Sequence, residues 1–177
     1  MSIRLPIEDN SDPLKTEKVN GIIYNTGAGT SRHAETVSNI MAVLHIFFAG
    51  KHCKPFTSEL DIHLDTENTY RPDASVICDF SNMRDDGYHG GPALVIEVLS
   101  PSTANRDRGD KYDNYQRYGV TEYLIINPDY LSIEQYALIN GVFKLQAIYF
   151  KPGTSFGSYA FEGLKFSLND IFEFRQG

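Results

Sequence analysis

The sequence contains no tryptophan and only two cysteines among its 177 residues. Cys53 and Cys78 lie far apart, with neither a CxxC pair nor the His/Cys spacing of metal ligands, which argues against a disulfide-rich scaffold and a zinc finger. A chain of this length buries enough surface to fold without disulfides or a structural metal. We therefore expect free thiols and a reducing, cytoplasmic location.

Long hydrophobic runs are also missing. The most apolar stretch, residues 41–50 (MAVLHIFFAG), is about half the ~20 residues that a membrane-spanning helix requires. Residues 1–15 mix charge and proline where a signal peptide needs an apolar stretch, so we expect no signal peptide.

Basic residues are in the minority, because 23 acidic residues face 16 basic ones and the net charge is −7. This balance argues against a surface built for general nucleic-acid binding, and a polyanionic partner would have to meet a local basic patch. Hydrophobic residues make up 41% of the chain, which excludes disorder as its main state. No repeat, low-complexity run or linker divides the chain, so we predict one domain over residues 1–177.

The pattern of apolar residues predicts a mixed α/β order. Asn20-Gly21 favours the tight turn of an N-terminal hairpin, and apolar residues at helical spacing predict a helix over residues 32–48, capped by Ser31. The remaining segments are predicted strands at 59–64, 74–78, 93–99, 122–127, 133–139 and 142–149, the last two joined by a hairpin turn, and a second helix at 103–118 with a weak point at Gly109. Residues 93–99 (ALVIEVL) form the central strand, buried on both faces.

Glu97 interrupts this apolar strand, and an ionised carboxylate is almost never buried without a partner or a metal. Asp73 follows Pro72 at the start of the preceding strand, so neighbouring strands would bring the two carboxylates together. Two hard oxygen ligands side by side suit Mg²⁺ or Mn²⁺. The alternative explanations are a strand with one solvent-exposed edge or an ion pair between Glu97 and an arginine.

The same residues resemble those of the PD-(D/E)XK nuclease superfamily and, more closely, the Uma-type putative restriction endonucleases, a family of bacterial domains of unknown function. The residues that carry the resemblance are Arg71-Pro72-Asp73, the run Glu97 to Thr103, Asp107, Lys111, Tyr115 and the run Gly119 to Tyr123, with Arg32-His33 and the closing hairpin in agreement. The resemblance covers nearly the whole chain.

This resemblance implies a restriction-endonuclease-like fold, in which helices flank a central mixed β-sheet and further β-hairpins lie at both ends. It implies a metal-dependent endonuclease that hydrolyses phosphodiester bonds of DNA. Asp73, Glu97 and the Val98 carbonyl would hold Mg²⁺ or Mn²⁺, and Lys111 would orient and activate a water. By analogy with enzymes that cut two strands, it also implies a homodimer.

The chain departs from the superfamily pattern at Leu99, which occupies the usual lysine position two residues after the glutamate, on the same strand face. Lys111 on the following helix resembles a migrated replacement, one turn after Asp107. The alternative is that Lys111 only pairs with Asp107 on an exposed helix face. The basic residues of this helix, Arg106, Arg108, Lys111 and Arg117, either contact phosphate or form such a salt-bridged face.

Two residues of the first helix complete the set of candidates. Glu35 falls opposite the apolar stripe and should face solvent, whereas His33 lies near the stripe, as a core histidine or as a neighbour of the metal ligands. The alternative function is a non-catalytic nucleic-acid-binding or regulatory module that retains the nuclease fold, which the acidic isoelectric point of about 5.1 favours.

Overall fold

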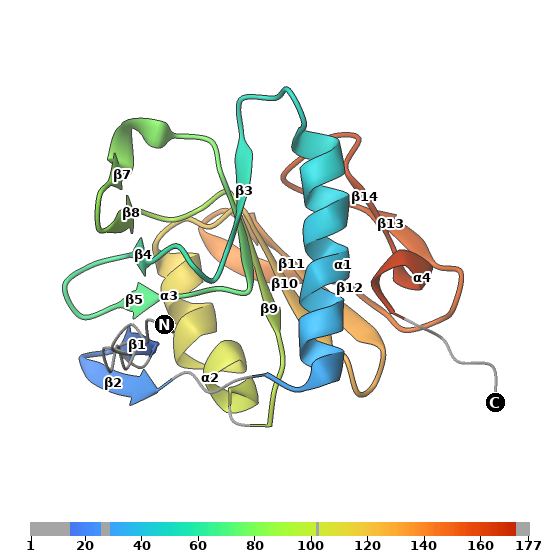
Figure 1. Ribbon diagram of the computed structural model, residues 1–177, viewed down its shortest axis with the longest axis horizontal. Coiled ribbons are helices and arrows are strands. Elements are labelled where there is room, and N and C mark those ends of the chain that lie inside the picture. The colour runs from blue at the N-terminus through green and yellow to red at the C-terminus, as the bar shows by residue number, and fades with distance from the viewer. Residues whose placement is uncertain (1–14, 26–28, 102, 173–177) are drawn as a thin grey trace, which may run out of the picture.

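The computed structural model describes residues 15–25, 29–101 and 103–172, which are arranged around a central six-stranded sheet (Figure 1). Its strand order is β12-β11-β10-β9-β6-β3, with bounds β3 (Lys54–Thr57), β6 (Ala74–Ile77), β9 (Leu94–Val98), β10 (Glu122–Asn127), β11 (Ser132–Ile139) and β12 (Val142–Tyr149). The pair β9–β10 is parallel and the other neighbours are antiparallel, so the sheet is mixed, as predicted. The expectation of no signal peptide concerns the N-terminal residues, of which 1–14 lie outside the described ranges. The single domain over residues 1–177 stays a prediction.

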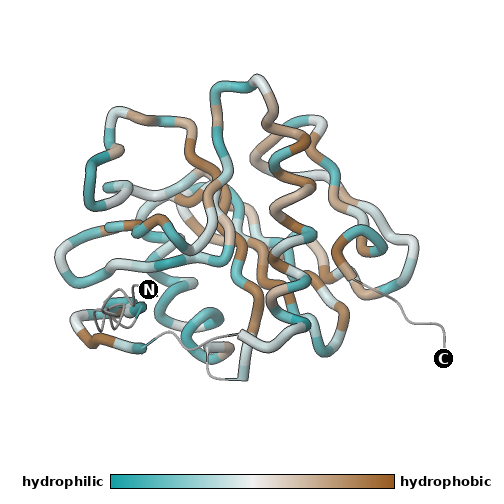
Figure 2. Tube along the Cα trace, in the orientation of Figure 1, coloured by the Kyte–Doolittle hydropathy of each residue, from teal (hydrophilic) through white to brown (hydrophobic). Residues whose placement is uncertain are grey.

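Helix α1 (Ser31–Phe48) covers one face of this sheet. Its buried stripe, Ile40, Met41, Leu44 and Phe48, packs in one apolar cluster with residues of β9, of the two-stranded sheet β13 (Ser155–Gly157) and β14 (Lys165–Ser167), and of α4 (Leu168–Ile171). Figure 2 shows the corresponding band of hydrophobic residues along α1. The helix was predicted to have Ser31 as its cap, but Thr30 caps it, because the Thr30 hydroxyl accepts a hydrogen bond from the His33 backbone N–H.

Two short helices and a second six-stranded sheet cover the opposite face. The helices are α2 (Ala104–Arg108) and α3 (Asp110–Arg117). The strands follow the order β2-β1-β5-β4-β8-β7, with bounds β1 (Thr16–Val19), β2 (Ile22–Asn25), β4 (Ile62–His63), β5 (Thr69–Tyr70), β7 (Met83–Arg84) and β8 (Gly87–His89), and a 3₁₀ turn η1 (Phe80–Asn82) precedes β7. The pair β1–β2 is the predicted hairpin, with Asn20 and Gly21 at positive φ in its turn.

Two predictions about local structure were wrong or incomplete, and one feature was not predicted. The helix predicted over residues 103–118 breaks at Gly109, whose φ of −114° and ψ of −107° lie outside the helical region. The strand predicted over residues 59–64 shrinks to Ile62–His63. The second sheet was not predicted as a sheet, because strands of two to four residues are too short to show an alternating pattern.

The burial of β9 explains how a carboxylate enters the core. Leu94, Ile96 and Val98 point into the cluster under α1, whereas Val95 and Leu99 belong to the cluster under α3 and the second sheet. Since side chains alternate along a strand, Glu97 points to the second face, between Val95 and Leu99. Every residue of β9 is buried, so this carboxylate has to find its partners inside the protein.

Cys53 and Cys78 form a disulfide, which corrects the expectation of free thiols. Strand β3 pairs antiparallel with β6 and places Lys54 opposite Ile77, so the next pair outward is Cys53 and Cys78, with Cα atoms 4.1 Å apart. The sequence hid this proximity because β3 was not predicted. Disulfides are rare in reducing compartments, so the two cysteines no longer support a cytoplasmic location. The cytoplasmic location stays a prediction.

Within the described ranges, none of the helices has the length and apolar character needed to cross a membrane.

We expect reduction of the Cys53–Cys78 disulfide to lower the free energy of unfolding by about 3 kcal/mol, because the bond closes a loop of 25 residues in the unfolded chain. Urea unfolding with and without reductant measures this difference. Thiol titration of the denatured, unreduced protein should find no free thiol. Two free thiols in that sample would contradict the bond.

Candidate metal and catalytic site

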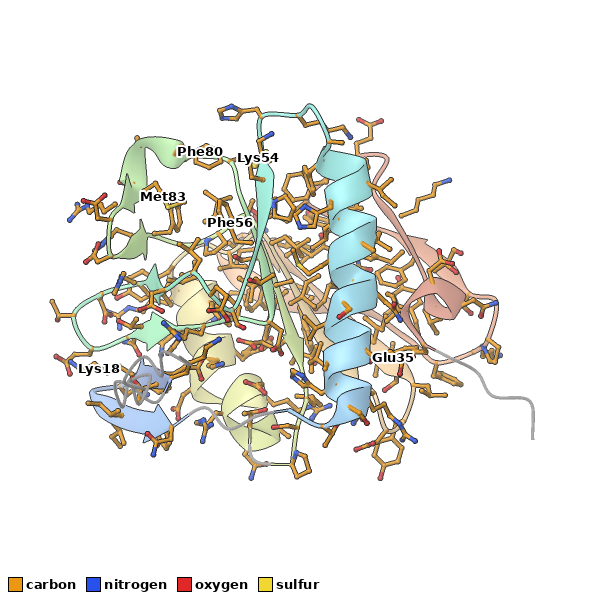
Figure 3. All side chains as sticks on the ribbon, in the orientation of Figure 1. Lys18, Glu35, Lys54, Phe56, Phe80 and Met83 are labelled. Atoms are coloured by element: carbon orange, nitrogen blue, oxygen red, sulfur yellow. A yellow bond between two sulfur atoms is a disulfide. The ribbon has the colours of Figure 1, made fainter. Side chains whose placement is uncertain are left out.

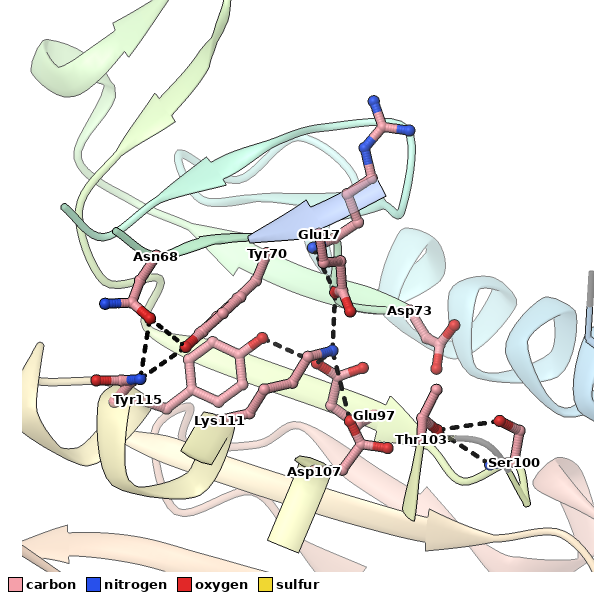
Figure 4. A network of polar contacts seen from close by, with 12 residues as sticks. Glu17, Asn68, Tyr70, Asp73, Glu97, Ser100, Thr103, Asp107, Lys111 and Tyr115 are labelled. Carbon is pink, nitrogen blue, oxygen red and sulfur yellow. Dashed lines mark hydrogen bonds and ion pairs between the residues drawn. The ribbon is translucent and has the colours of Figure 1, made fainter. Parts of the chain in front are cut away.

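A cleft of about 600 Å³ opens where β9 ends, and it is lined from α1, α3, the N-terminal hairpin and the loop that follows β9. Its lining brings together the predicted residues Asp73, Glu97, Val98 and Lys111. The rest of the lining comes from Lys15, Glu17, Asn25, Gly29, Thr30, His33, Ser58, Arg71, Ser100, Pro101 and Thr103. Figure 4 shows the polar contacts at its base.

Asp73 and Glu97 come from neighbouring strands. The antiparallel register pairs Ala74 with Ile96, so one residue further Asp73 lies opposite Glu97. The Val98 backbone N–H donates a hydrogen bond of 2.8 Å to Asp73 Oδ2, which fixes this carboxylate against the end of β9. The Asp73 side chain is 19% exposed, whereas that of Glu97 is 4% exposed, so one carboxylate faces the cleft and the other forms its floor.

Lys111 reaches this floor from α3 and is surrounded by three carboxylates. Its Nζ atom lies 2.8 Å from Glu17 Oε1, 3.0 Å from Glu97 Oε1 and 3.4 Å from Asp107 Oδ1. We call these four side chains, Glu17, Glu97, Asp107 and Lys111, the carboxylate cage; each is at most 4% exposed. The Lys111–Asp107 pair predicted from the sequence exists, but it is buried rather than exposed.

In the carboxylate cage three carboxyl groups share one ammonium, and the pKa values of Glu97, Asp107 and Lys111 are shifted. Burial raises the pKa of Glu97 well above its ordinary value, although Lys111 acts in the opposite direction. Burial raises the pKa of Asp107 as well. For Lys111, burial would lower the pKa, but Glu97, Glu17 and Asp107 together raise it well above its usual range, so the ammonium stays protonated.

Asp107 Oδ1 is the least satisfied oxygen of the carboxylate cage. It lies within ion-pair distance of Lys111, yet no described residue donates a hydrogen bond to it. A buried carboxylate oxygen without a hydrogen bond costs free energy. The carboxylate cage therefore has the capacity to accept a further cation or donor.

Glu97 and Lys111 are fixed by neighbours on α3 and β5. Tyr115 donates a hydrogen bond of 2.8 Å to Glu97 Oε1, the same oxygen that Lys111 contacts. Asn114 lies three residues after Lys111 on α3, and its amide donates to the Tyr70 hydroxyl and to Asn68 Oδ1. These contacts, drawn in Figure 4, hold α3 against β5 and so set the position of Lys111.

His33 lies at the cleft rather than in the apolar core. Its Nε2 atom is 3.3 Å from Asp73 Oδ2, and the hydrogen bond to Asp73 raises the pKa of His33 against the opposing effect of burial. The interpretation of His33 as a neighbour of the predicted ligands therefore agrees with the geometry better than a core histidine does. Glu35 is exposed, as predicted, and Figure 3 shows it on the side of α1 away from β9.

Glu17, near the N-terminus of the chain, contributes a carboxylate that was not predicted from the sequence. Its Oε1 atom also accepts a hydrogen bond from the Arg71 backbone N–H, at 2.9 Å, next to Asp73. A glutamate on a four-residue strand looks like an ordinary exposed residue, and only the pairing of β1 with β5 brings it to the site.

The lysine position two residues after Glu97 could not hold a lysine without loss of packing, because Leu99 is 5% exposed and lies in the apolar cluster under α3. Among the other basic residues of α2 and α3, Arg106 stacks 4.4 Å from the Tyr24 ring and Arg108 pairs with Glu134. Part of the helix face that was a candidate for phosphate contact is therefore already paired with other residues of the protein.

The fold is shared with a solved structure. A putative nuclease belonging to DUF820 from Anabaena variabilis ATCC 29413 superposes with a TM-score of 0.74 over 89% of each chain, at 18% sequence identity. The mixed sheet, its flanking helices and this likeness place the chain in the class of restriction-endonuclease-like folds, as predicted from the sequence.

The family follows from a second comparison. The Uma2 family, described as "Putative restriction endonuclease", matches residues 3–169, and the chain belongs to it. Two relatives come from Synechocystis sp. (strain ATCC 27184 / PCC 6803 / Kazusa). The uncharacterized protein slr1290 is 32% identical over 69% of this chain and 65% of its own length, and the uncharacterized protein sll1609 is 25% identical over 69% and 71%.

We expect Lys111→Met to lower the free energy of unfolding by about 3–5 kcal/mol at pH 7, because three buried carboxylates lose their shared cation. Glu97 and Asp107 have raised pKa values in the folded state, so they favour folding at acidic pH, and this contribution is lost as the pH rises toward those values. The loss caused by Lys111→Met should therefore shrink near pH 4.

Denaturant unfolding at several pH values measures this effect. The exposed Lys165→Met is the matched control and should change stability by less than about 0.5 kcal/mol at every pH. Equal effects of the two variants, or an effect of Lys111→Met that does not depend on pH, would refute the carboxylate cage.

Proposed function

We propose that this protein is a metal-dependent endonuclease that hydrolyses phosphodiester bonds of DNA. The observation that carries the proposal is the convergence of Asp73, Glu97 and the Val98 backbone with a buried lysine in one cleft. Membership of the Uma2 family and the fold shared with a putative nuclease support the same class of activity.

The donor set suits a divalent cation such as Mg²⁺ or Mn²⁺. Asp73, Glu97 and the Val98 carbonyl offer hard oxygen atoms, the chemistry that these ions prefer. Three buried carboxyl groups share one ammonium in the carboxylate cage, and a bound cation would offset part of the cost of charging Glu97 there. When bound, such an ion neutralises charge on the phosphate and lowers the pKa of a bound water.

Each of the chain's own groups has a separate task in this proposal. The Val98 N–H fixes Asp73 through Oδ2, and Lys111 and Tyr115 fix Glu97 through Oε1. Both carboxylates are thereby held in place before a ligand arrives, which lowers the cost of ordering them. His33 steadies Asp73 from the side of α1.

Lys111 is the positioning cation for the attacking water. Its raised pKa keeps it protonated, so it acts as a hydrogen-bond donor and a positive charge rather than as a base. A positive charge next to the water favours its deprotonated form. Lys111 contacts Glu97, so the proposed water site and the proposed cation site share one neighbour.

DNA would approach a protein of net charge −7, so contacts with phosphate depend on the cleft rim. Lys15 and Arg71 line the cleft, but they pair with Glu59 and Asp61 respectively. This compensation favours the alternative function, a nucleic-acid-binding or regulatory module without catalysis. Cleavage assays decide between the two.

We expect cleavage of DNA in the presence of Mg²⁺ or Mn²⁺ and none in EDTA, measured on single- and double-stranded substrates. Asp73→Asn should lower the rate by at least about 10²-fold, since it removes an ion ligand from a partly exposed position with little risk to the fold. Lys111→Met should lower it by about 10²–10³-fold. The exposed Lys165→Met should cleave like the wild type.

Binding is measured separately from cleavage, as the thermal stabilisation that saturating Mn²⁺ produces. Asp73→Asn should lose this stabilisation, and Lys111→Met should retain it. A wild-type protein that binds Mn²⁺ and DNA but leaves the DNA intact would establish the non-catalytic alternative, and full activity of Lys111→Met would remove its proposed role.

The proposed homodimer has a candidate surface at β12, the edge strand of the central sheet. The side chains of Val142, Leu145 and Ile148 are 44–50% exposed along this strand. An edge strand with exposed apolar side chains favours pairing with another strand, and a second copy of β12 is the partner that matches it in length and character.

We expect sedimentation equilibrium to give twice the 19.9 kDa of one chain at micromolar concentration. Leu145→Lys should shift the mass to that of one chain, because it places a charge in the proposed contact. Ile46→Lys, which changes an exposed apolar residue of α1, is the matched control and should leave the dimer intact. A wild-type mass of one chain would end the dimer proposal.

A further inference from the structure

A second group of ligating side chains lies outside the carboxylate cage and the cleft. It consists of His63 on β4, His89 on β8 and Asp86 in the turn between β7 and β8, and none of the three lines the cleft. Each offers one ligand atom, and these atoms lie within 4.8 Å of one another. Figure 1 shows the strands concerned in the second sheet, with β4 beside β8.

The backbone places the two imidazoles side by side. Strands β4 and β8 are parallel neighbours, and their register pairs His63 with His89. The rings stack with centroids 4.6 Å apart and an interplanar angle of 23°. The register thus brings two potential nitrogen ligands to the same place on the second sheet.

Asp86 meets both rings. Its Oδ1 atom lies 2.9 Å from His89 Nε2, and its backbone carbonyl lies 3.0 Å from His63 Nε2. Two imidazole nitrogens and one carboxylate oxygen thus converge on one space.

The other nitrogen of His63 has a partner of the kind that metal-binding histidines use. Thr69 Oγ1 lies 3.0 Å from Nδ1, so the ring can carry its proton there and present the Nε2 lone pair. Without an ion, the Nε2–H tautomer donates a hydrogen bond to the Asp86 carbonyl, 3.0 Å away. A bound cation would take the place of that proton, with Thr69 accepting from Nδ1–H.

Gly87 keeps the space beside Nε2 open. A Cβ atom at this position would lie 3.0 Å from His63 Nε2 and 2.5 Å from the Asp61 carbonyl, and the φ of +139° is one that other residues rarely adopt. A side chain at position 87 would thus crowd the space in which the ligand atoms converge.

The geometry points to a binding site for a transition-metal ion of the Zn²⁺ class, formed by His63, Asp86 and His89. Two imidazoles and a carboxylate suit Zn²⁺, whereas Mg²⁺ prefers oxygen ligands alone. A water would complete four-coordination of the Zn²⁺ ion. Ligand atoms of a tetrahedral zinc site lie about 3.3 Å apart, so the group has to contract. Asp86, with a side chain 65% exposed, is free of packing that would prevent it.

A bound ion would connect β4 with the turn that joins β7 and β8. These strands have only two or three residues each and few ladder hydrogen bonds. The ion would therefore stabilise this end of the second sheet, independently of the proposed cation in the cleft.

We expect Zn²⁺ to bind the Asp73→Asn variant, in which the cleft site is disabled, with one ion per chain by isothermal titration calorimetry. At about hundredfold excess over its Kd, Zn²⁺ should raise the melting temperature by about 5–10 °C. Using this background separates the site from the proposed nuclease site, so either can fail without the other.

In the same background, His89→Gln and Asp86→Asn should each weaken Zn²⁺ binding by at least tenfold, and Thr69→Val by about tenfold or more. His45→Gln, which changes an exposed histidine of α1, is the control and should bind like its parent. Absence of Zn²⁺ binding, or unchanged affinity in both His89→Gln and Asp86→Asn, would overturn the proposal.

Discussion

The buried ammonium of Lys111 is the interaction on which the rest of the site depends. It is the common partner of carboxylates from β1, β9 and α2. Because an unpaired ion in a protein interior is very costly, Lys111 offsets much of the cost of holding these three carboxylates inside. It thereby joins the N-terminal hairpin, the central sheet and the two short helices at one point (Figure 4).

The carboxylate cage also shows a conflict between stability and chemistry. One lysine does not balance three carboxylates, and burial raises the pKa of Glu97 and Asp107. An apolar cluster of the same shape would stabilise the fold more. Perturbed buried groups that line a cleft are typical of functional sites, where binding of a ligand offsets the cost that folding left behind.

Much of the fold and part of the site were predictable because their signals are local. The apolar strand around Glu97, the helix stripe ending at Phe48 and the turn at Asn140-Gly141 need only neighbouring residues to be recognised, and the structure has all three. The second sheet, the disulfide and Glu17 were not predictable, since each depends on pairing between distant, short strands. Asp73 and Glu97 lie between these cases, because a family resemblance supplied the pairing that the pattern alone only suggested.

The position of Glu17 has a consequence for how the protein folds. Its strand pairs with β5 at a single register position, and its partner Lys111 lies far along the chain. A contact between distant segments forms only once the entropy of closing the intervening loop has been overcome. Lys111 lacks one of its three carboxylates whenever the N-terminal hairpin is undocked. The charge distribution of the cleft is therefore complete only in the fully folded chain.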